Sequence, residues 1–360
     1  MATIRVLMAG GGTGGHIIPA LAVARELVER YSADVLFVGT PRGLELKLVP
    51  EAGFRLRLVN VGPLNSVSLW RRLRTLYDLP RAISDCRRLI REFQPGVVLG
   101  VGGYASGPAL AAALRLKVPT MVFEPNAMPG MANRIVGRKV NAAAVNFPMA
   151  APWFSNCKVT GIPVRPEFFT LPPADLARPH LLVFGGSQGA RILNQQVPAV
   201  ITGLMEAVPG LTVLHQSGLR HVQATEAAYL TSGADPARWT VRPFIDDMPA
   251  CFARASLVMS RAGASTVAEL AAAGRPALLV PFAAAADGHQ KRNAEAMVMA
   301  GAAVMLEERE MEEKDKLQGI LTGLLKDPER LQAMSLAARD QAHPDAAERI
   351  ARRLVELAQG

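Results

Sequence analysis

Residues 4–16 read IRVLMAGGGTGGH, and this stretch decides the fold of the first half of the chain. An apolar run of strand length leads into five glycines within residues 10–15, and a helical pattern follows. Gly10, Gly12 and Gly15 match the G-x-G-x-x-G spacing of a dinucleotide-binding turn. So many glycines also leave bare backbone N–H groups at the start of a helix, where an anion such as a diphosphate binds. A tight turn that holds no ligand is the alternative.

A nicotinamide site needs more than this spacing. It requires an acidic residue near the end of the second strand, which holds the ribose hydroxyls. Here the second strand-like run is VLFVG (35–39), and the only nearby acid, Asp34, precedes it. The sequence therefore disfavours a dehydrogenase and favours an anion site. His16 ends the glycine cluster, and an imidazole at that position could accept a proton from a bound hydroxyl.

The order strand, glycine cluster, helix occurs twice. In the first half, strand-like runs lie at 4–9, 35–39, 96–101, 119–123 and 141–146, with helical patterns at 16–30, 69–92 and 106–115. In the second half, the runs lie at 180–185, 211–215, 239–243, 256–260 and 276–281, and FGGSQGAR (184–191) follows the first of them. Strands separated by helices form parallel sheets. We expect an α/β fold with two Rossmann-like parallel-sheet domains that face each other across a cleft.

A proline-rich stretch separates the two halves. GIPVRPEFFTLPPADLARP (161–179) holds five prolines, which cannot join a central strand and are typical of a linker. We expect a first domain over 1–163, a second over 164–344, and a final amphipathic helix over 345–360.

Charge is distributed unevenly along the chain. The net charge is +9, yet residues 1–163 hold 20 of the 40 Lys and Arg and only 9 of the 31 Asp and Glu. Only the first half is therefore expected to meet an anionic partner. No run of 18 apolar residues is free of Pro, Gly or charge, so no membrane-spanning helix is expected. Three widely spaced cysteines and the absence of a cleavable leader indicate reduced thiols in the cytosol.

The second half carries a nucleotide-like motif, SRAGASTVAEL (260–270). Gly263 makes the turn, Ser265 and Thr266 stand at a helix start, and Glu269 lies one turn further on. The helix start favours phosphates, and a carboxylate there accepts both hydroxyls of a ribose. A capping hydroxyl with a solvated glutamate is the alternative. No D-x-D occurs, and the pair Asp287 and His289 makes a poor metal site, so no metal is predicted.

Taken together, the motifs resemble glycosyltransferase family 28, the bacterial N-acetylglucosaminyltransferases of peptidoglycan synthesis. The matching segments span most of the chain in order: GGTGGHIIPALAVA (11–24), VGGYASGP (101–108), EPNAMPGMANR (124–134), GIPVR (161–165), FGGSQGARILN (184–194), PFIDDM (243–248), SRAGASTVAELAAAGRPALLVPF (260–282) and HQKRNA (289–294). The resemblance implies the GT-B architecture, with a first domain for the acceptor, a second for the donor, and a last helix that returns to the first domain. It implies transfer from UDP-N-acetylglucosamine to the 4-hydroxyl of the muramyl residue of lipid I, with inversion, to give lipid II. No cofactor is implied.

The resemblance also assigns residues to roles. His16 is the candidate base, with Glu124 as the alternative. The acceptor diphosphate is assigned to Gly12, Gly14, Gly15, Gly102, Gly103 and Tyr104. Donor contacts are assigned to Thr13, Gly14, Gly15, Asn126, Arg165, Ser187, Gln188, Ile245, Ala264, Ser265, Thr266, Val267, Ala268, Glu269 and Gln290. The family often shows H-E-Q-N where this chain has Phe123-Glu124-Pro125-Asn126, so no mechanism through that histidine operates here.

The segment 64–93 is expected to hold the first domain on the membrane that carries lipid I. Leu69, Trp70 and Leu73 are spaced as an apolar stripe, with Arg71, Arg72 and Arg74 around it. A surface helix with solvated arginines is the alternative; the few aromatic residues do not favour nucleic acid. We therefore expect a peripheral protein on the anionic cytoplasmic face of the bacterial membrane, with cell-wall synthesis proteins as possible partners. A glycolipid synthase, or a UDP-N-acetylglucosamine 2-epimerase, is the competing function.

Overall fold

The structure is a computed structural model that describes residues 3–62 and 69–360, and in residues 69–77 and at Ala286 it describes the backbone alone. The chain divides into two compact units. One consists of Met1–Val164 together with His343–Gly360, and the other of Arg165–Ala342.

The first unit is a parallel sheet of seven strands in the order β3-β2-β1-β4-β5-β6-β7. Its strands are β1 (Arg5–Ala9), β2 (Asp34–Gly39), β3 (Arg55–Leu58), β4 (Val97–Gly100), β5 (Thr120–Glu124), β6 (Ala142–Val145) and β7 (Cys157–Val159). Its helices are α1 (Gly14–Tyr31), α2 (Glu45–Glu51), α3 (Leu69–Phe93), α4 (Ser106–Arg115), α5 (Met131–Val136), the 3-10 turn η1 (Pro148–Trp153) and α13 (Ala346–Gln359). The central strands β4, β5 and β6 are buried along their whole length, which explains their continuous apolar sequences.

The second unit repeats this order with six parallel strands, β10-β9-β8-β11-β12-β13. They are β8 (His180–Phe184), β9 (Thr212–Gln216), β10 (Trp239–Arg242), β11 (Leu257–Ser260), β12 (Ala277–Leu279) and β13 (Ala303–Met305). The longer helices are α6 (Arg191–Ala207), α7 (Val222–Thr231), α8 (Met248–Arg254), α9 (Ala264–Ala273), α10 (His289–Met299), α11 (Lys314–Leu325) and α12 (Pro328–Arg339). Short 3-10 turns are η2 (Pro166–Phe168), η3 (Pro236–Arg238), η4 (Ala286–Gly288) and η5 (Glu308–Glu312). The predicted class of two Rossmann-like parallel sheets is confirmed.

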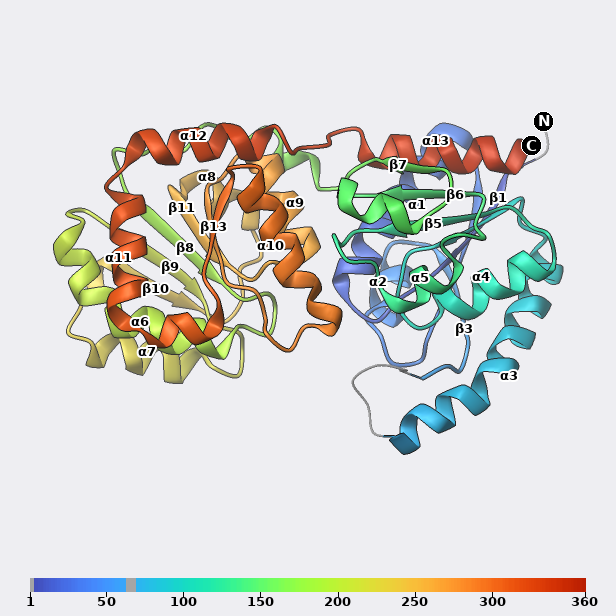
Figure 1. The fold of residues 1–360 in the computed structure, drawn as a ribbon, viewed down its shortest axis with the longest axis horizontal. Coiled ribbons are helices and arrows are strands. Elements are labelled where there is room, and N and C mark those ends of the chain that lie inside the picture. Colours follow the sequence, from blue (N-terminus) through green and yellow to red (C-terminus); the bar gives the residue numbers. More distant parts are fainter. Residues whose placement is uncertain (1–2, 63–68) are drawn as a thin grey trace. The chain divides into compact units, whose positions relative to one another are not determined.

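The elements that the sequence analysis missed are short or polar. β3 reads RLRL and is an edge strand with exposed arginines, so it lacks the apolar run that marks a buried strand. β7 and β13 have only three residues each. The helices α2, α5, α7, α11 and α12 were also not predicted. Helix α13 begins at Ala346 and packs on α1 and β4 (Figure 1), with Arg30 paired to Glu348 at 3.3 Å.

The proline-rich segment after Val164 is fixed to the second unit by buried Arg275. The guanidinium of Arg275 donates to the carbonyls of Pro172 (2.7 Å) and Phe252 (2.6 Å). Arg339 donates to the carbonyl of Leu171 at 3.0 Å. The chain therefore passes between units over a few residues near Val164 and Ala342, and not along the whole proline-rich stretch.

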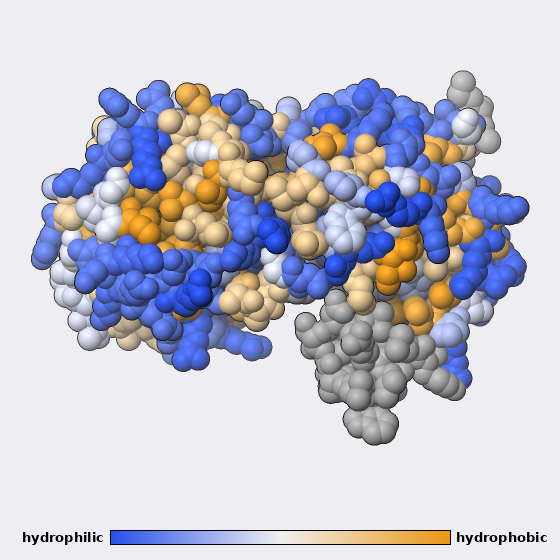
Figure 2. Space-filling view, viewed as in Figure 1, coloured by the Kyte–Doolittle hydropathy of each residue, from blue (hydrophilic) through white to orange (hydrophobic). Residues whose placement is uncertain are grey.

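Hydrophilic residues surround scattered apolar patches on the visible face of both units (Figure 2). Among the described residues, every helix is too short or too polar to cross a bilayer.

Candidate functional site

The strand order of the first unit reverses at β1, which pairs with β2 on one side and β4 on the other. Ala9 at the end of β1 lies opposite Gly100 at the end of β4, so the loops that follow these strands meet at one edge of the sheet. Such a reversal opens a crevice beyond the carboxyl ends of the strands, where ligands bind in open α/β sheets.

The two glycine loops at this edge are in contact. Gly11 N donates to the carbonyl of Gly102 at 3.3 Å, and a Cβ on Gly103 would lie 2.2 Å from the Gly11 carbonyl oxygen. Gly102 and Gly103 both have positive φ, at +92° and +79°. The close approach and the left-handed backbone together require glycine at both positions. Tyr104, which follows them, is 47% exposed.

Helix α1 begins with uncapped backbone donors. Gly10 N donates to Val38 O, and Gly12 N donates to the Glu45 carboxylate at 2.8 Å. The next three N–H groups, of Thr13, Gly14 and Gly15, have no acceptor in the described part of the chain, and the Thr13 side chain makes no capping bond. Three such groups at a helix start form an anion site. Of the glycines assigned to the acceptor diphosphate, Gly12 therefore contributes its loop conformation, since its N–H is used by Glu45.

His16 lies in the first turn of α1 against the second glycine loop. A Cβ on Gly102 would be 2.8 Å from His16 Cε1, so the imidazole packs directly on that glycine. The side chain is half-buried. This position places a titratable group beside the open N–H groups of the loop.

Glu124, the alternative base, ends β5 and is 2% exposed. Its Oε1 accepts from Asn126 N (3.0 Å) and Asn126 Nδ2 (3.1 Å), and its Oε2 accepts from Gly130 N (2.9 Å) and Asn133 Nδ2 (2.9 Å). Four donors around one carboxylate hold the loop 125–130 in place. The same bonds direct the Asn126 amide toward Glu124.

In the second unit, β8 pairs with β11, and the strand order again reverses between them. Helix α9 follows β11 through Gly263, which has extended backbone and gives no side-chain cap. The N–H groups of Ala264, Ser265 and Thr266 have no acceptor within the described residues, and Ser265 Oγ is buried there without a partner. Buried polar atoms are rarely left unpaired, so this helix start fits a ligand oxygen. Val267 and Ala268 are buried in the second unit, and their packing holds the first turn of α9 in place.

Glu269 lies one turn into α9. Burial raises the pKa of Glu269 to about 7, and the positive charge of Arg165 opposes this rise. Arg165 itself lies 5.1 Å from the Phe168 ring. A carboxylate at this position can accept hydrogen bonds from the hydroxyls of a ligand. Its raised pKa also marks Glu269 as a candidate functional-site residue.

The loop after β8 is the second glycine-rich part of this site. Ser187 and Gln188 are exposed, while the glycines around them approach the turn after β9. A Cβ on Gly189 would lie 1.7 Å from the Ser217 carbonyl oxygen. Gln216, at the end of β9, donates to Gly186 O (3.0 Å) and accepts from Ile245 N (2.8 Å). The Ile245 N–H is therefore already hydrogen-bonded, so the carbonyl oxygen is the backbone group of Ile245 that could contact a nucleobase.

A buried histidine lies beneath this loop. His215 Nε2 is 3.0 Å from Asn194 Oδ1, and Nδ1 is 3.1 Å from the Tyr229 hydroxyl. Asn194 Nδ2 donates to Ser217 O at 2.9 Å, so the network reaches the turn beside Gly189. Burial lowers the pKa of His215 to about 3, so the ring stays neutral. The polar end of the run LTVLHQS was the signal by which sequence reasoning could have found His215 and Gln216.

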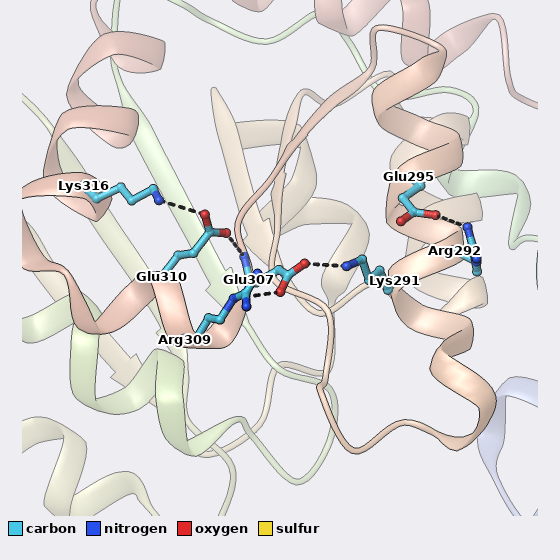
Figure 3. Close-up of polar contacts among 7 residues, drawn as sticks. All are labelled: Lys291, Arg292, Glu295, Glu307, Arg309, Glu310 and Lys316. Atoms are coloured by element: carbon cyan, nitrogen blue, oxygen red, sulfur yellow. Dashed lines mark hydrogen bonds and ion pairs between the residues drawn. The ribbon is translucent and has the colours of Figure 1, made fainter.

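Gln290 is held near the start of α10, with its Oε1 accepting from Phe282 N at 3.0 Å. The next residue, Lys291, pairs with Glu307 at 2.5 Å, and Glu307 also pairs with Arg309 (Figure 3). The hydrogen bond from Lys291 lowers the pKa of Glu307. These exposed pairs contribute little energy each but orient α10 relative to η5.

The structure does not bring all predicted residues into one described site. The backbone at Leu69, Trp70, Arg71, Arg72, Leu73 and Arg74 is helical, but their side chains lie outside the described part of the chain. Within the described residues, no three His, Cys, Asp or Glu side chains form a group that could hold a metal ion.

Two doubly wound parallel-sheet units, each with open helix N-termini where its strand order reverses, define the GT-B architecture. Models of the N-terminal and C-terminal domains of glycosyltransferase family 28 match residues 6–145 and 180–350. The chain belongs to this family.

Similar proteins are known by sequence and by structure. The UDP-N-acetylglucosamine--N-acetylmuramyl-(pentapeptide) pyrophosphoryl-undecaprenol N-acetylglucosamine transferase of Anaeromyxobacter sp. (strain Fw109-5) is 46% identical, over 98% of this chain and 93% of the relative. The crystal structure of Acinetobacter baumannii MurG has a TM-score of 0.81 at 30% identity and covers 98% of this chain and 99% of that chain. A UDP-GlcNAc 2-epimerase from Neisseria meningitidis, at 15% identity, TM-score 0.69 and coverage of 98% and 100%, shares the fold.

Glu269 makes nucleotide binding depend on pH. Ionised Glu269 is the better acceptor for ribose hydroxyls, and its pKa is about 7, so affinity should fall below pH 7, by up to about tenfold in all once the carboxylate is protonated. Calorimetric titration with UDP-N-acetylglucosamine measures this, because its diesterified diphosphate keeps its charge in this range. Glu269→Gln should bind about tenfold more weakly at pH 8 and lose the pH dependence. Glu206→Gln, an exposed glutamate of the same unit, is the control, and a pH-dependent Glu269→Gln would contradict the assignment.

Proposed function

We propose that this chain transfers N-acetylglucosamine from UDP-N-acetylglucosamine to the 4-hydroxyl of the muramyl residue of lipid I, with inversion, to give lipid II. The observation that carries the proposal is the pair of open helix N-termini, one in each unit, in a chain of family 28. Both reactants are diphosphates, so each needs its own anion site. The name of the relative that is 46% identical supports these substrates.

The second unit is assigned to the donor. The N–H groups of Ala264, Ser265 and Thr266 and the loop at Ser187 and Gln188 would face the UDP diphosphate. Negative charge grows on that diphosphate as the glycosidic bond breaks, so donors already fixed in place stabilise the transition state. The Ile245 carbonyl is assigned to the uracil and Gln290 to the sugar hydroxyls.

The first unit is assigned to the acceptor and the base. The N–H groups of Thr13, Gly14 and Gly15, with Gly102 and Tyr104 opposite, would hold the lipid I diphosphate. His16 is favoured as the base, because both oxygens of Glu124 already accept two hydrogen bonds each. Glu124 is then assigned to holding the loop that carries Asn126.

The reaction is tested with purified protein, a lipid I analogue and radiolabelled UDP-N-acetylglucosamine. We expect label in a β-1,4-linked disaccharide lipid. Transfer to diacylglycerol in its place would identify a glycolipid synthase. Release of UDP and a C2-epimerised sugar from the donor alone would identify an epimerase. Either result would overturn the proposal.

Replacement of His16 by Ala should lower kcat by about 10²–10⁴, because general-base catalysis contributes this much. UDP-N-acetylglucosamine affinity should stay unchanged, since His16 is not among the residues assigned to the donor. His221→Ala, outside both assigned sites, is the control. If His16→Ala keeps its turnover and only the acceptor KM rises, His16 contacts the diphosphate and is not the base.

We also propose that the start of α3 attaches the protein to anionic lipid, since lipid I lies in the membrane. Each basic residue near such a surface contributes about 1 kcal/mol. The triple variant Arg71→Glu, Arg72→Glu, Arg74→Glu should lose co-sedimentation with vesicles that contain anionic lipid, at physiological salt. Reversal of the exposed Arg178, Arg220 and Arg330 in the second unit is the charge-matched control. If the Arg71, Arg72 and Arg74 variant binds the vesicles as the wild type does, the start of α3 is not the lipid-binding surface.

A further inference from the structure

The most buried carboxylate near the glycine loops belongs to Glu45, at the start of α2, which sequence reasoning did not single out. Its side chain is 0% exposed, and no Lys, Arg or His of the described chain forms an ion pair with it. Its partners are three donors. Gly12 N lies 2.8 Å from Oε2, and Thr40 N and Thr40 Oγ1 each lie 2.9 Å from Oε1. A buried charge needs such donors to be tolerated.

Three glycines make the space for this carboxylate. A Cβ on Gly43 would lie 1.8 Å from Oε2, one on Gly11 2.2 Å from Oε1, and one on Gly39 2.6 Å from Cγ. These glycines come from the β1 loop, from the end of β2 and from the turn before α2. The chain therefore closes around Glu45 from three segments, and a longer side chain at any of these positions would displace it.

Glu45 and its neighbour Leu44 hold Gly12 at its N–H group and at its carbonyl. The Glu45 carboxylate accepts the Gly12 N–H, and the neighbouring Leu44 N donates to the Gly12 carbonyl at 3.3 Å. Gly12 has a φ of +95°, which this clamp holds in place. With Gly10 and Gly11 also paired to Val38 and Gly102, the first N–H groups left open are those that begin α1.

We propose that Glu45 is a positioning residue that sets where the acceptor diphosphate binds in this loop. The proposal rests on the proposed function. By accepting the Gly12 N–H, Glu45 removes that donor from the ligand and places a negative charge beneath the loop. The diphosphate is thereby directed to the N–H groups of Thr13, Gly14 and Gly15, next to His16. Glu45 itself touches no substrate.

The variant Glu45→Gln tests this with little change of shape. If its amide oxygen accepts from Thr40, its NH₂ group faces the Gly12 N–H, and two donors then oppose each other. We expect the KM for a short-chain lipid I analogue to rise at least about tenfold, since a small misplacement of binding groups has such effects. The KM for UDP-N-acetylglucosamine should stay within twofold. Loss of stability alone would lower the active fraction, and hence kcat, without changing the acceptor KM.

Two further variants separate positioning from stability. Thr40→Val removes one donor to Oε1 but leaves the bond to Gly12, so it should lower the melting temperature and leave the acceptor KM unchanged. Glu51→Gln makes the same chemical change at an exposed site on α2 and should alter neither. If Glu45→Gln does not fold, Glu45→Asp replaces it, because a side chain one methylene shorter cannot reach both Thr40 and Gly12.

The outcomes distinguish the two proposals. A wild-type protein that transfers no sugar to the analogue would overturn the proposed function. If the wild type is active and the acceptor KM of Glu45→Gln stays within twofold of the wild-type value, the positioning role is overturned. An equal rise in both KM values would also overturn it, because the effect would then not be specific to the acceptor loop.

Discussion

Parallel pairing of the first and fourth strands of each sheet is the constraint on which both candidate sites depend. In the first unit Ala9 lies opposite Gly100, and in the second Phe184 lies opposite Ser260. Because the paired strands run in the same direction, the loops that follow them emerge side by side. The helices that begin there point their open N–H groups to the same edge of the sheet. Every residue assigned to a diphosphate follows one of these strands.

The anion sites that we propose at these edges consist mainly of backbone N–H groups. Glycine is required where two loops touch, as at Gly103 against Gly11 and at Gly189 against Ser217. The buried carboxylates of Glu45 and Glu124 are fully hydrogen-bonded to the chain around them. Their hydrogen bonds hold the loops at Gly12 and at residues 125–130. An unpaired buried carboxylate would be costly, so these loops and their acids stabilise each other.

The two units differ in electrostatics although they share a topology. The first carries the excess of basic residues, which agrees with the proposed acceptor in an anionic membrane. The second is nearly neutral, and its key acid, Glu269, has a pKa raised to about 7 by burial. At the donor diphosphate site that we propose in this unit, the helix dipole at the start of α9 takes the place of positive side chains.

The sequence by itself determined the class of fold, the two glycine-rich loops, the helix start at Ala264 and the family. These features are local, because an apolar run followed by glycines and a helical pattern can adopt few structures other than a strand, a tight turn and a helix. The sequence analysis singled out neither Glu45 nor the polar strand end at His215 and Gln216, and sequence alone could not show that these side chains support the loops. Their partners lie far along the chain, as with Gly12 and Glu45 or Gln216 and Ile245. Glu124 differs, because its four donors lie within nine residues of it in the chain. Only the tertiary structure shows that the loop 125–130 and Asn133 turn back to donate to its carboxylate, since the sequence of this segment has no pattern that predicts such bonds.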